Sequence, residues 1–507
     1  MLRVVGVGLV LAGLVVLGSG CARQQPGRAP ARTPKSEPRV RQALTPPAEQ
    51  PRTRHAIKVP AHPFTERDYQ QVRAALHRRM LIAGYLQHGR RDPRWDKQAL
   101  SYLEAWVKIY SGLPGAPSAD RLLSEGAALS RTCTDPLVLY LCARALLLAG
   151  RKADAGPLFQ RALAGLECSR YPKYWTFAAA VRFMETGPKS GLSLAQAHAL
   201  AQRVIALAPQ MAAEDTFRGR EQRVLWELLN WSCEEGGVLS GGWAWRLVGE
   251  LDNHPGKLAV ADLLRGMLEE EVAWDARGYG SSAEVSPEGW KQFEQHIAIA
   301  AKRYRQAWQR DPSLPEAPTR MIAMSAHLEA DEQSAMWLWF QRAVDAQFDY
   351  APAYSTMLHY LKPRWVGSYE EMHDFGLACL ETGRFDTRVP GYYLSALCAI
   401  ERDRELLEHP NPGEYWKRPG IYERLLAMCD SYQRAQPQGR LQWDTLRAAV
   451  AMKCGYHDQA AVIVKRLGSR GSDYITNRVY RMPYAQFRAA VEAATKGKSS
   501  PRGHSER

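Results

Sequence analysis

The sequence predicts an all-α protein, and three observations support this prediction. Apolar residues recur at three- and four-residue steps from Thr65 onward, which places them on one face of a helix. No stretch alternates apolar and polar residues for long enough to indicate a sheet. Gly and Pro fall between segments of 12 to 18 residues, as at 112–115, 187–188 and 410–413.

Composition and charge restrict the class of protein further. Of 507 residues, 46% are hydrophobic, and 15 Trp and 22 Tyr exclude a wholly disordered chain. The formal net charge of +14 is concentrated at the ends, because residues 22–60 carry +7 and residues 496–507 carry +3. Residues 61–495 carry only +3. The charge therefore argues against a nucleic-acid-binding face on the folded body.

The first 21 residues have the parts of an export signal. Arg3 is followed by an unbroken run of apolar residues and glycine over 4–17, and small residues then lead to Cys21. A helix of this run spans about 21 Å, which is short of the roughly 30 Å hydrocarbon core. Residues 1–21 are therefore predicted to be a signal peptide rather than a permanent transmembrane helix.

Cys21, preceded by small residues, resembles the lipobox of bacterial lipoproteins. The resemblance implies that the thiol is acylated and anchors the chain to a membrane. Gly18 stands where the family usually has Leu, so ordinary cleavage and an uncleaved anchor remain alternatives. Ala22 rather than Asp after the cysteine implies the periplasmic face of the outer membrane in a Gram-negative cell, and otherwise a membrane anchor at the cell surface.

Residues 22–63 are predicted to form a disordered tether. They contain nine prolines and almost no large apolar residues, so they cannot bury a core. The basic segment 496–507 is predicted to be a disordered tail. The simpler interpretation of the tether is that it is a soluble spacer. The alternative is that it binds peptidoglycan or anionic lipid.

The helices of the body are expected to pair into repeating hairpins. Within 135–167, small Ala143 lies on a first helix and Gly150 at a turn, and Ala155, Phe159 and Ala162 follow on a second helix. This spacing resembles the tetratricopeptide repeat. Partial copies lie at Ala300, Tyr304, Ala307 and Pro312, at Ala197, Ala201, Val204 and Pro209, at Met336, Phe340 and Ala343, and at Ala460, Val464 and Leu467. Their irregular intervals predict a degenerate α-solenoid of stacked hairpins.

We expect the body to divide into residues 64–260, 261–400 and 401–495. Segment 273–390 contains Trp-Asp-Ala-Arg-Gly from Trp274 and Pro-Arg-Trp-Val-Gly-Ser from Pro363. These elements resemble an uncharacterised bacterial domain-of-unknown-function family with a tetratricopeptide-like body. The resemblance implies helical repeats and no known activity.

Two places in this segment are candidate binding spots. Arg364 and Trp365 are expected at a helix junction, as either a displayed cation beside an aromatic ring or a packed tryptophan with an arginine that satisfies carbonyls. Ser368 is expected to cap the next helix. Arg277 and Tyr279 are either part of a rim loop or merely in a turn.

The sequence lacks the common motifs of an enzyme. It has no phosphate-binding loop, no Gly-x-Ser-x-Gly nucleophile elbow, and no His-Glu-x-x-His or Cys-x-x-Cys pair for zinc. The run 269–271 of three glutamates is interpreted as a solvated helix face, because consecutive helical residues diverge by about 100°. We therefore expect no catalytic residues, no metal and no cofactor.

Nine cysteines remain to be explained. With Cys21 acylated, eight are left in a compartment that permits disulfides. Cys133 precedes one helix of the first hairpin and Cys168 follows the other, so antiparallel packing brings them near each other. A Cys133–Cys168 disulfide is therefore a hypothesis, whereas Cys142 and Cys398 are expected to be buried thiols.

The leading hypothesis is a non-enzymatic envelope lipoprotein whose stacked helices bind another protein or a peptide. One alternative is a protein that binds cell-wall or another anionic polymer through its basic tether and tail. A hydrolase with an unrecognised site is the second alternative.

Overall fold

The fold is all-α. The computed structural model describes residues 55–214, 216–234, 236–254, 258–278, 280–328 and 335–496. In this part of the chain there are 22 α-helices with connecting turns and no β-strand, which confirms the predicted class. The expected lipid-acceptor Cys21, the tether up to residue 54 and the tail from residue 497 lie outside the described residues.

The described helices belong to two compact units. One comprises residues 59–357, and the other comprises the chain from residue 358 onward. The division differs from the expected boundaries after 260 and 400. Each expected boundary would cut through a helix, α11 or α18, that packs against its neighbours on both sides.

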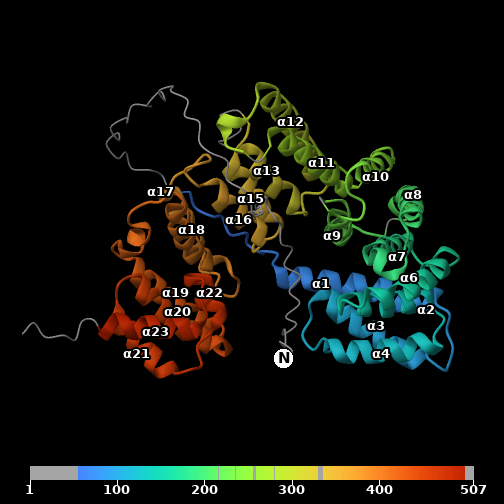
Figure 1. Ribbon diagram of the computed structural model, residues 1–507, viewed down its shortest axis with the longest axis horizontal. Helices are drawn as coiled ribbons and strands as arrows, with labels where there is room; N and C mark the ends of the chain where they lie inside the picture. Colours follow the sequence, from blue (N-terminus) through green and yellow to red (C-terminus); the bar gives the residue numbers. More distant parts are fainter. Residues whose placement is uncertain are drawn as a thin grey trace, which may run out of the picture. The chain divides into compact units, whose positions relative to one another are not determined.

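The first unit contains α1 to α15 and most of α16 (Figure 1). α1 continues through a π-helical turn, Arg78–Ala83, into α2. The bounds are α1 Glu66–His77, α2 Gly84–His88, α3 Asp96–Ser111, α4 Ala119–Thr132, α5 Pro136–Leu148, α6 Lys152–Glu167, α7 Lys173–Thr186, α8 Leu194–Ala213, α9 Gln222–Cys233, α10 Gly242–Asp252, α11 Ala259–Arg277, α12 Pro287–Arg310, α13 Glu316–Ser325, α15 Met336–Ala346 and α16 Ala351–Tyr360.

The second unit contains the remaining seven described helices. Their bounds are α17 Tyr369–Glu381, α18 Tyr392–Leu406, α19 Ile421–Ala435, α20 Arg440–Lys453, α21 His457–Leu467, α22 Asp473–Tyr480 and α23 Tyr484–Lys496. Within this unit α17 packs on α18, α20 on α21, and α23 on both α21 and α22.

Helices that are adjacent in sequence form the hairpins. The main pairs are α5 with α6, α11 with α12, α13 with α15, α17 with α18 and α20 with α21. The first helix of a pair is often buried on every side: α5 buries all residues from Pro136 to Ala145. Its partner α6 is amphipathic and buries one face that includes Phe159. A helix that is apolar all round must lie inside the fold, which explains this layering.

The residues of the repeat frame lie in the core. Ala143, Phe159 and Ala162 are fully buried, as are Ala300 and Tyr304. The other frame positions at 155, 307, 336, 340, 343, 460, 464 and 467 are buried as well. The loosest copy departs from the frame because Ala197 is only half-buried and Pro209 lies within α8 rather than beyond its end.

One glycine explains the close approach of α11 and α12. A Cβ on Gly266 would lie 2.5 Å from the ring of Tyr304, the aromatic residue of the repeat frame on α12. Only a residue without a side chain fits there, because carbon atoms in contact are normally 3.5–4.0 Å apart. Gly266 is therefore the small residue that the frame requires on the first helix.

The described part of the chain includes no helix that is both long and apolar enough to cross a membrane.

Two histidines, one buried and one half-buried, make the stability of the first unit depend on pH. His77 on α1 is 6% exposed, and its Nδ1 lies 3.2 Å from the hydroxyl of Ser111 on α3. Burial, together with nearby Arg73, lowers the pKa of His77 to about 3. Burial also lowers the pKa of His327 to about 4, and Arg277 adds to that shift.

We predict that the free energy of unfolding falls as the pH drops from 7.5 to 5. The unfolded chain takes up a proton near pH 6.5, but folded His77 does not until about pH 3, so acid favours the unfolded state. At pH 5 the loss from His77 alone is about 2 kcal/mol. Urea unfolding followed by circular dichroism should show a weaker pH dependence for His77→Gln than for the parent. Exposed His62→Gln serves as the control, and an equal pH dependence in both variants would contradict the prediction.

Candidate functional site

The centre of the first unit holds a largely enclosed arginine, Arg223 on α9, whose side chain is 13% exposed. Its Nε lies 2.8 Å from Oε1 of Glu316 on α13, which is 5% exposed. Its Nη1 donates a hydrogen bond of 2.6 Å to Oε1 of Gln347. The guanidinium also lies 4.1 Å from the ring centroid of Tyr69 on α1 and 4.7 Å from that of Tyr350. We call these five residues the central cluster.

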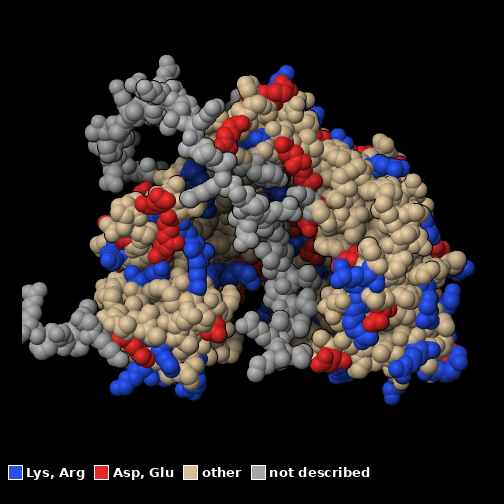
Figure 2. Space-filling view, in the orientation of Figure 1, with Lys and Arg blue, Asp and Glu red and all other residues tan. Residues whose placement is uncertain are grey.

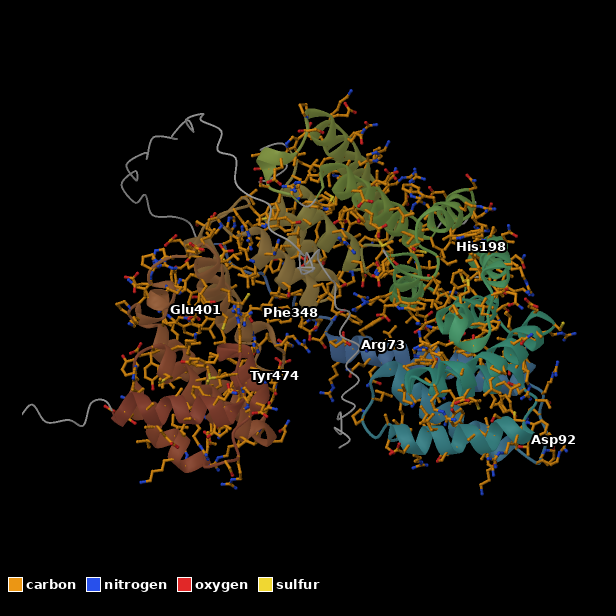
Figure 3. The ribbon with its side chains drawn as sticks, viewed as in Figure 1. Arg73, Asp92, His198, Phe348, Glu401 and Tyr474 are labelled. Atoms are coloured by element: carbon orange, nitrogen blue, oxygen red, sulfur yellow. The ribbon has the colours of Figure 1, made fainter. Side chains whose placement is uncertain are left out.

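The central cluster brings together the first and last helices of the unit. The N–H of Phe348 donates to the carbonyl of Phe64 at 2.8 Å, and the N–H of Glu66 donates to Asp349 Oδ1 at 2.7 Å. Figure 3 labels Phe348 and Arg73, which belong to the two sides of this junction. The helices of the unit therefore follow an arc that closes on itself (Figure 1).

Burial and opposite charge act against each other in the cluster. Burial disfavours the charge on Arg223, but Glu316 and Tyr69 outweigh this effect, and the pKa of Arg223 is raised. Burial raises the pKa of Glu316, and the neighbouring Arg223 only partly offsets it. The positive charge of Arg223 and the negative charge of Glu316 therefore stabilise each other. Removing one partner of such a pair typically costs about 3–5 kcal/mol.

A row of half-buried and exposed side chains extends from this centre along the inner helices. Arg182 on α7 lies 3.5 Å from the ring centroid of Trp231 on α9, and its Nη1 donates to Glu185 at 2.9 Å. We call the row the inner stripe; its members are Arg182, Glu185, Glu227, Asn230, Trp231, Glu234, Glu270 and Arg320. Glu227 and Glu234 are the exposed members, and 45% of the Glu227 side chain is accessible.

The inner stripe is continuous through contacts between helices. Asn230 Nδ2 on α9 donates at 3.3 Å to Glu234, which directly follows that helix, and Arg320 on α13 lies near Glu234. Arg320 Nη1 in turn donates to Glu270 on α11 at 3.3 Å. Four helices, α7, α9, α11 and α13, therefore contribute to one surface of mixed charge with a tryptophan in it.

Arg277 is occupied by internal contacts. Its guanidinium lies 5.5 Å from the ring of Trp274 and 5.3 Å from the ring of Trp290, and its Nη1 donates to the carbonyls of Gly278 and Gly280. These contacts close the C-terminus of α11, as in the turn interpretation. Tyr279, the other predicted residue, lies outside the described residues.

Arg364 and Trp365 lie in the turn between α16 and α17. Arg364 Nη2 is 3.1 Å from Oδ1 of Asp403, whose side chain is 1% exposed, so it holds the turn to α18. Trp365 is half-buried against the rings of His359 and Tyr360. The expected cap is confirmed, because Ser368 Oγ accepts a hydrogen bond from the N–H of Glu371. Arg364 thus pairs with a carboxylate rather than with helix-end carbonyls.

The structure does not contain the hypothesised Cys133–Cys168 disulfide. Both residues are free thiols, with Cys133 buried and Cys168 exposed. Burial raises the pKa of Cys133 to about 12, which keeps that thiol protonated and unreactive. Cys142 and Cys398 are buried free thiols, as expected.

The interpretation of 269–271 as a solvated face is wrong. Glu269 is 2% exposed, with His296 Nδ1 at 2.7 Å and Arg265 Nη2 at 2.8 Å. One heptad away on the same helix, Asp262 is fully buried and contacts Arg303 of α12. The partners come from the antiparallel helix α12, in which His296 and Arg303 are also seven residues apart. This seam of charge pairs joins α11 to α12.

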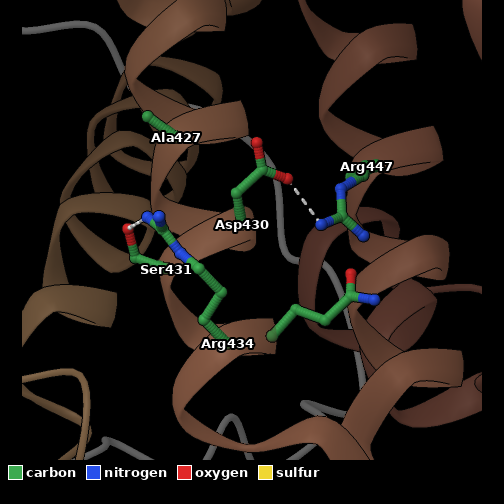
Figure 4. Close-up of a pocket in the computed structure, with 6 residues that line it drawn as sticks. Ala427, Asp430, Ser431, Arg434 and Arg447 are labelled. Atoms are coloured by element: carbon green, nitrogen blue, oxygen red, sulfur yellow. Dashed lines mark hydrogen bonds and ion pairs between the residues drawn. The ribbon is translucent and has the colours of Figure 1, made fainter.

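A catalytic centre is not apparent in the described residues. The pair of Glu269 and His296 has the geometry of an acid–imidazole dyad, but His296 makes no side-chain hydrogen bond to a hydroxyl or thiol there. No group of three or more His, Cys, Asp or Glu in this part of the chain could hold a metal ion. In the second unit a shallow pocket between α19 and α20 contains the ion pair of Asp430 and Arg447, at 2.6 Å, and Arg434 bonded to Ser431 (Figure 4).

Comparison with protein-family models and with curated proteins finds no match to the chain.

Proposed function

We propose that this chain is a non-enzymatic scaffold that binds a protein or peptide partner through its stacked helices. The observation that carries the proposal is the inner stripe, in which α7, α9, α11 and α13 contribute neighbouring polar side chains and Trp231 to one surface. Helical-repeat proteins use such multi-helix surfaces to hold extended partners. Mixed charge and an aromatic side chain suit a peptide, which offers both polar and apolar groups.

The envelope location belongs to the same proposal. The lipobox-like sequence ending at Cys21 supports acylation and export, and the proline-rich tether supports a body held away from the membrane. A partner would then be another envelope protein. The alternative in which basic tether and tail bind an anionic polymer draws its support from the +7 and +3 charges of those segments.

Photo-crosslinking in intact cells tests the binding surface. We predict that p-benzoylphenylalanine in place of Glu227 yields a discrete higher-mass adduct, because that side chain is 45% exposed within the inner stripe. The matched control places the same group at Asp154, which is 53% exposed on α6 and outside the stripe. Adducts at both positions, or at neither, would refute the proposal that the inner stripe is a binding surface.

Cell fractionation tests the anchor. We predict that Cys21→Ala releases the protein from the membrane fraction, because the acylated thiol is the proposed attachment point. Metabolic labelling with a fatty acid should mark the parent chain and not the variant. Unchanged fractionation of the variant, together with an unlabelled parent, would rule out acylation.

A further inference from the structure

The second unit carries a group of cations without carboxylate partners. Most arginines of this unit are paired, as Arg364 is with Asp403 and Arg481 with Glu405. Arg388, Arg402 and Arg478 are among the described arginines of this unit that have no carboxylate within ion-pair distance. We define the basic face as Lys362, Arg388, Arg402 and Arg478.

Contacts between segments distant in sequence hold the basic face together. Arg402 on α18 donates from Nη2 to the backbone carbonyl of Arg478 on α22 at 2.7 Å. Arg478 Nη2 in turn donates to Ser395 Oγ on α18 at 2.8 Å, and Ser395 Oγ donates to the carbonyl of Gly391, three residues after Arg388. Figure 2 shows Lys and Arg side chains gathered on the second unit around α18 and α22.

The cations of the basic face repel one another. Lys362 is partly buried, and its pKa is lowered by that burial and by the neighbouring charges of Arg364 and Arg402. Asp403 acts on Lys362 with the opposite sign, but it is already bonded to Arg364 and to the hydroxyl of Tyr369. A bound anion would relieve this repulsion, and arginine forks suit carboxylate groups because they can bind them in a bidentate manner.

The length of the basic face indicates a linear anion. Arg388 and Arg402 are separated by fourteen residues along α18 and its entry, which corresponds to about 21 Å. A single phosphate group cannot span that distance, whereas an extended peptide covers it with about six residues. Leu406 follows Arg402 by one helical turn, on the same side of α18, and is 65% exposed. An apolar side chain that continues a row of cations favours a peptide over a polyphosphate or a lipid headgroup.

We propose that the basic face binds an acidic segment of a protein partner, about six residues long and followed by an apolar residue. This inference rests on the proposed function, because it names the chemistry of a partner that the scaffold would hold. Binding would be electrostatic and would therefore weaken with ionic strength.

The test uses the full chain and a fluorescent hexaglutamate peptide that ends in leucine, with binding followed by fluorescence anisotropy. The parent should bind, and the double variant Arg402→Gln/Arg478→Gln should bind at least about tenfold more weakly, since each lost charge pair contributes about 0.7 kcal/mol. The control Lys465→Gln/Arg470→Gln removes the same charge from exposed positions elsewhere in this unit. It should weaken binding less than about twofold. Circular dichroism confirms that both variants are folded.

Three outcomes would overturn the inference. Equal losses in the two double variants would mean that the peptide senses only net charge. Binding of polyphosphate or of phosphatidylglycerol vesicles that depends on Arg402 and Arg478, without peptide binding, would assign the face to a different ligand. A chain that crosslinks to a partner through position 227 but does not bind hexaglutamate would refute the basic face alone and leave the scaffold proposal intact.

Discussion

The ion pair of Arg223 and Glu316 is the interaction on which the first unit depends. Stacked hairpins are held mainly by their sequence neighbours, so an array of this kind is normally open at both ends. Here a charge on α9 faces an acid on α13 and the ring of Tyr69 on α1. Glu316 and Tyr69 are buried and only 13% of the Arg223 side chain is exposed, so the loss of one charged partner is costly. The pair therefore converts an array into a closed unit.

Closure has consequences for any binding surface. Inner helices such as α5 and α7 are covered almost completely, so the polar groups accessible to a partner are confined to places where those helices leave gaps. The inner stripe is one such place, with Glu227 and Glu234 as its exposed members. The basic face of the second unit has a different character, because its charges are of one sign and lack carboxylate partners in the described residues. The two units thus offer chemically distinct surfaces for a partner.

Local features of the fold could be predicted from the sequence, and features that need distant partners could not. The hairpins, the cap at Ser368 and the buried frame positions such as Tyr304 follow from spacing within one or two helices. The burial of Glu269 could not be predicted in this way, because it depends on His296, 27 residues away on another helix. The same reason applies to the central cluster and to the pairing of Arg364 with Asp403. Arg223 is the second residue of α9, directly before a largely apolar run, and this local pattern does not identify a partner.

Thermal unfolding of two variants tests the central role of the Arg223 pair most directly. We predict that Arg223→Met lowers the free energy of unfolding by about 3–5 kcal/mol, because it leaves the buried carboxylate of Glu316 without its partner. The double variant Arg223→Met/Glu316→Leu should recover most of that loss, since it removes both charges. Arg121→Met, which breaks an exposed pair with Glu125, should cost less than about 1 kcal/mol. If Arg223→Met loses no more stability than Arg121→Met, and the double variant recovers none, then the pair of Arg223 and Glu316 does not hold the unit together.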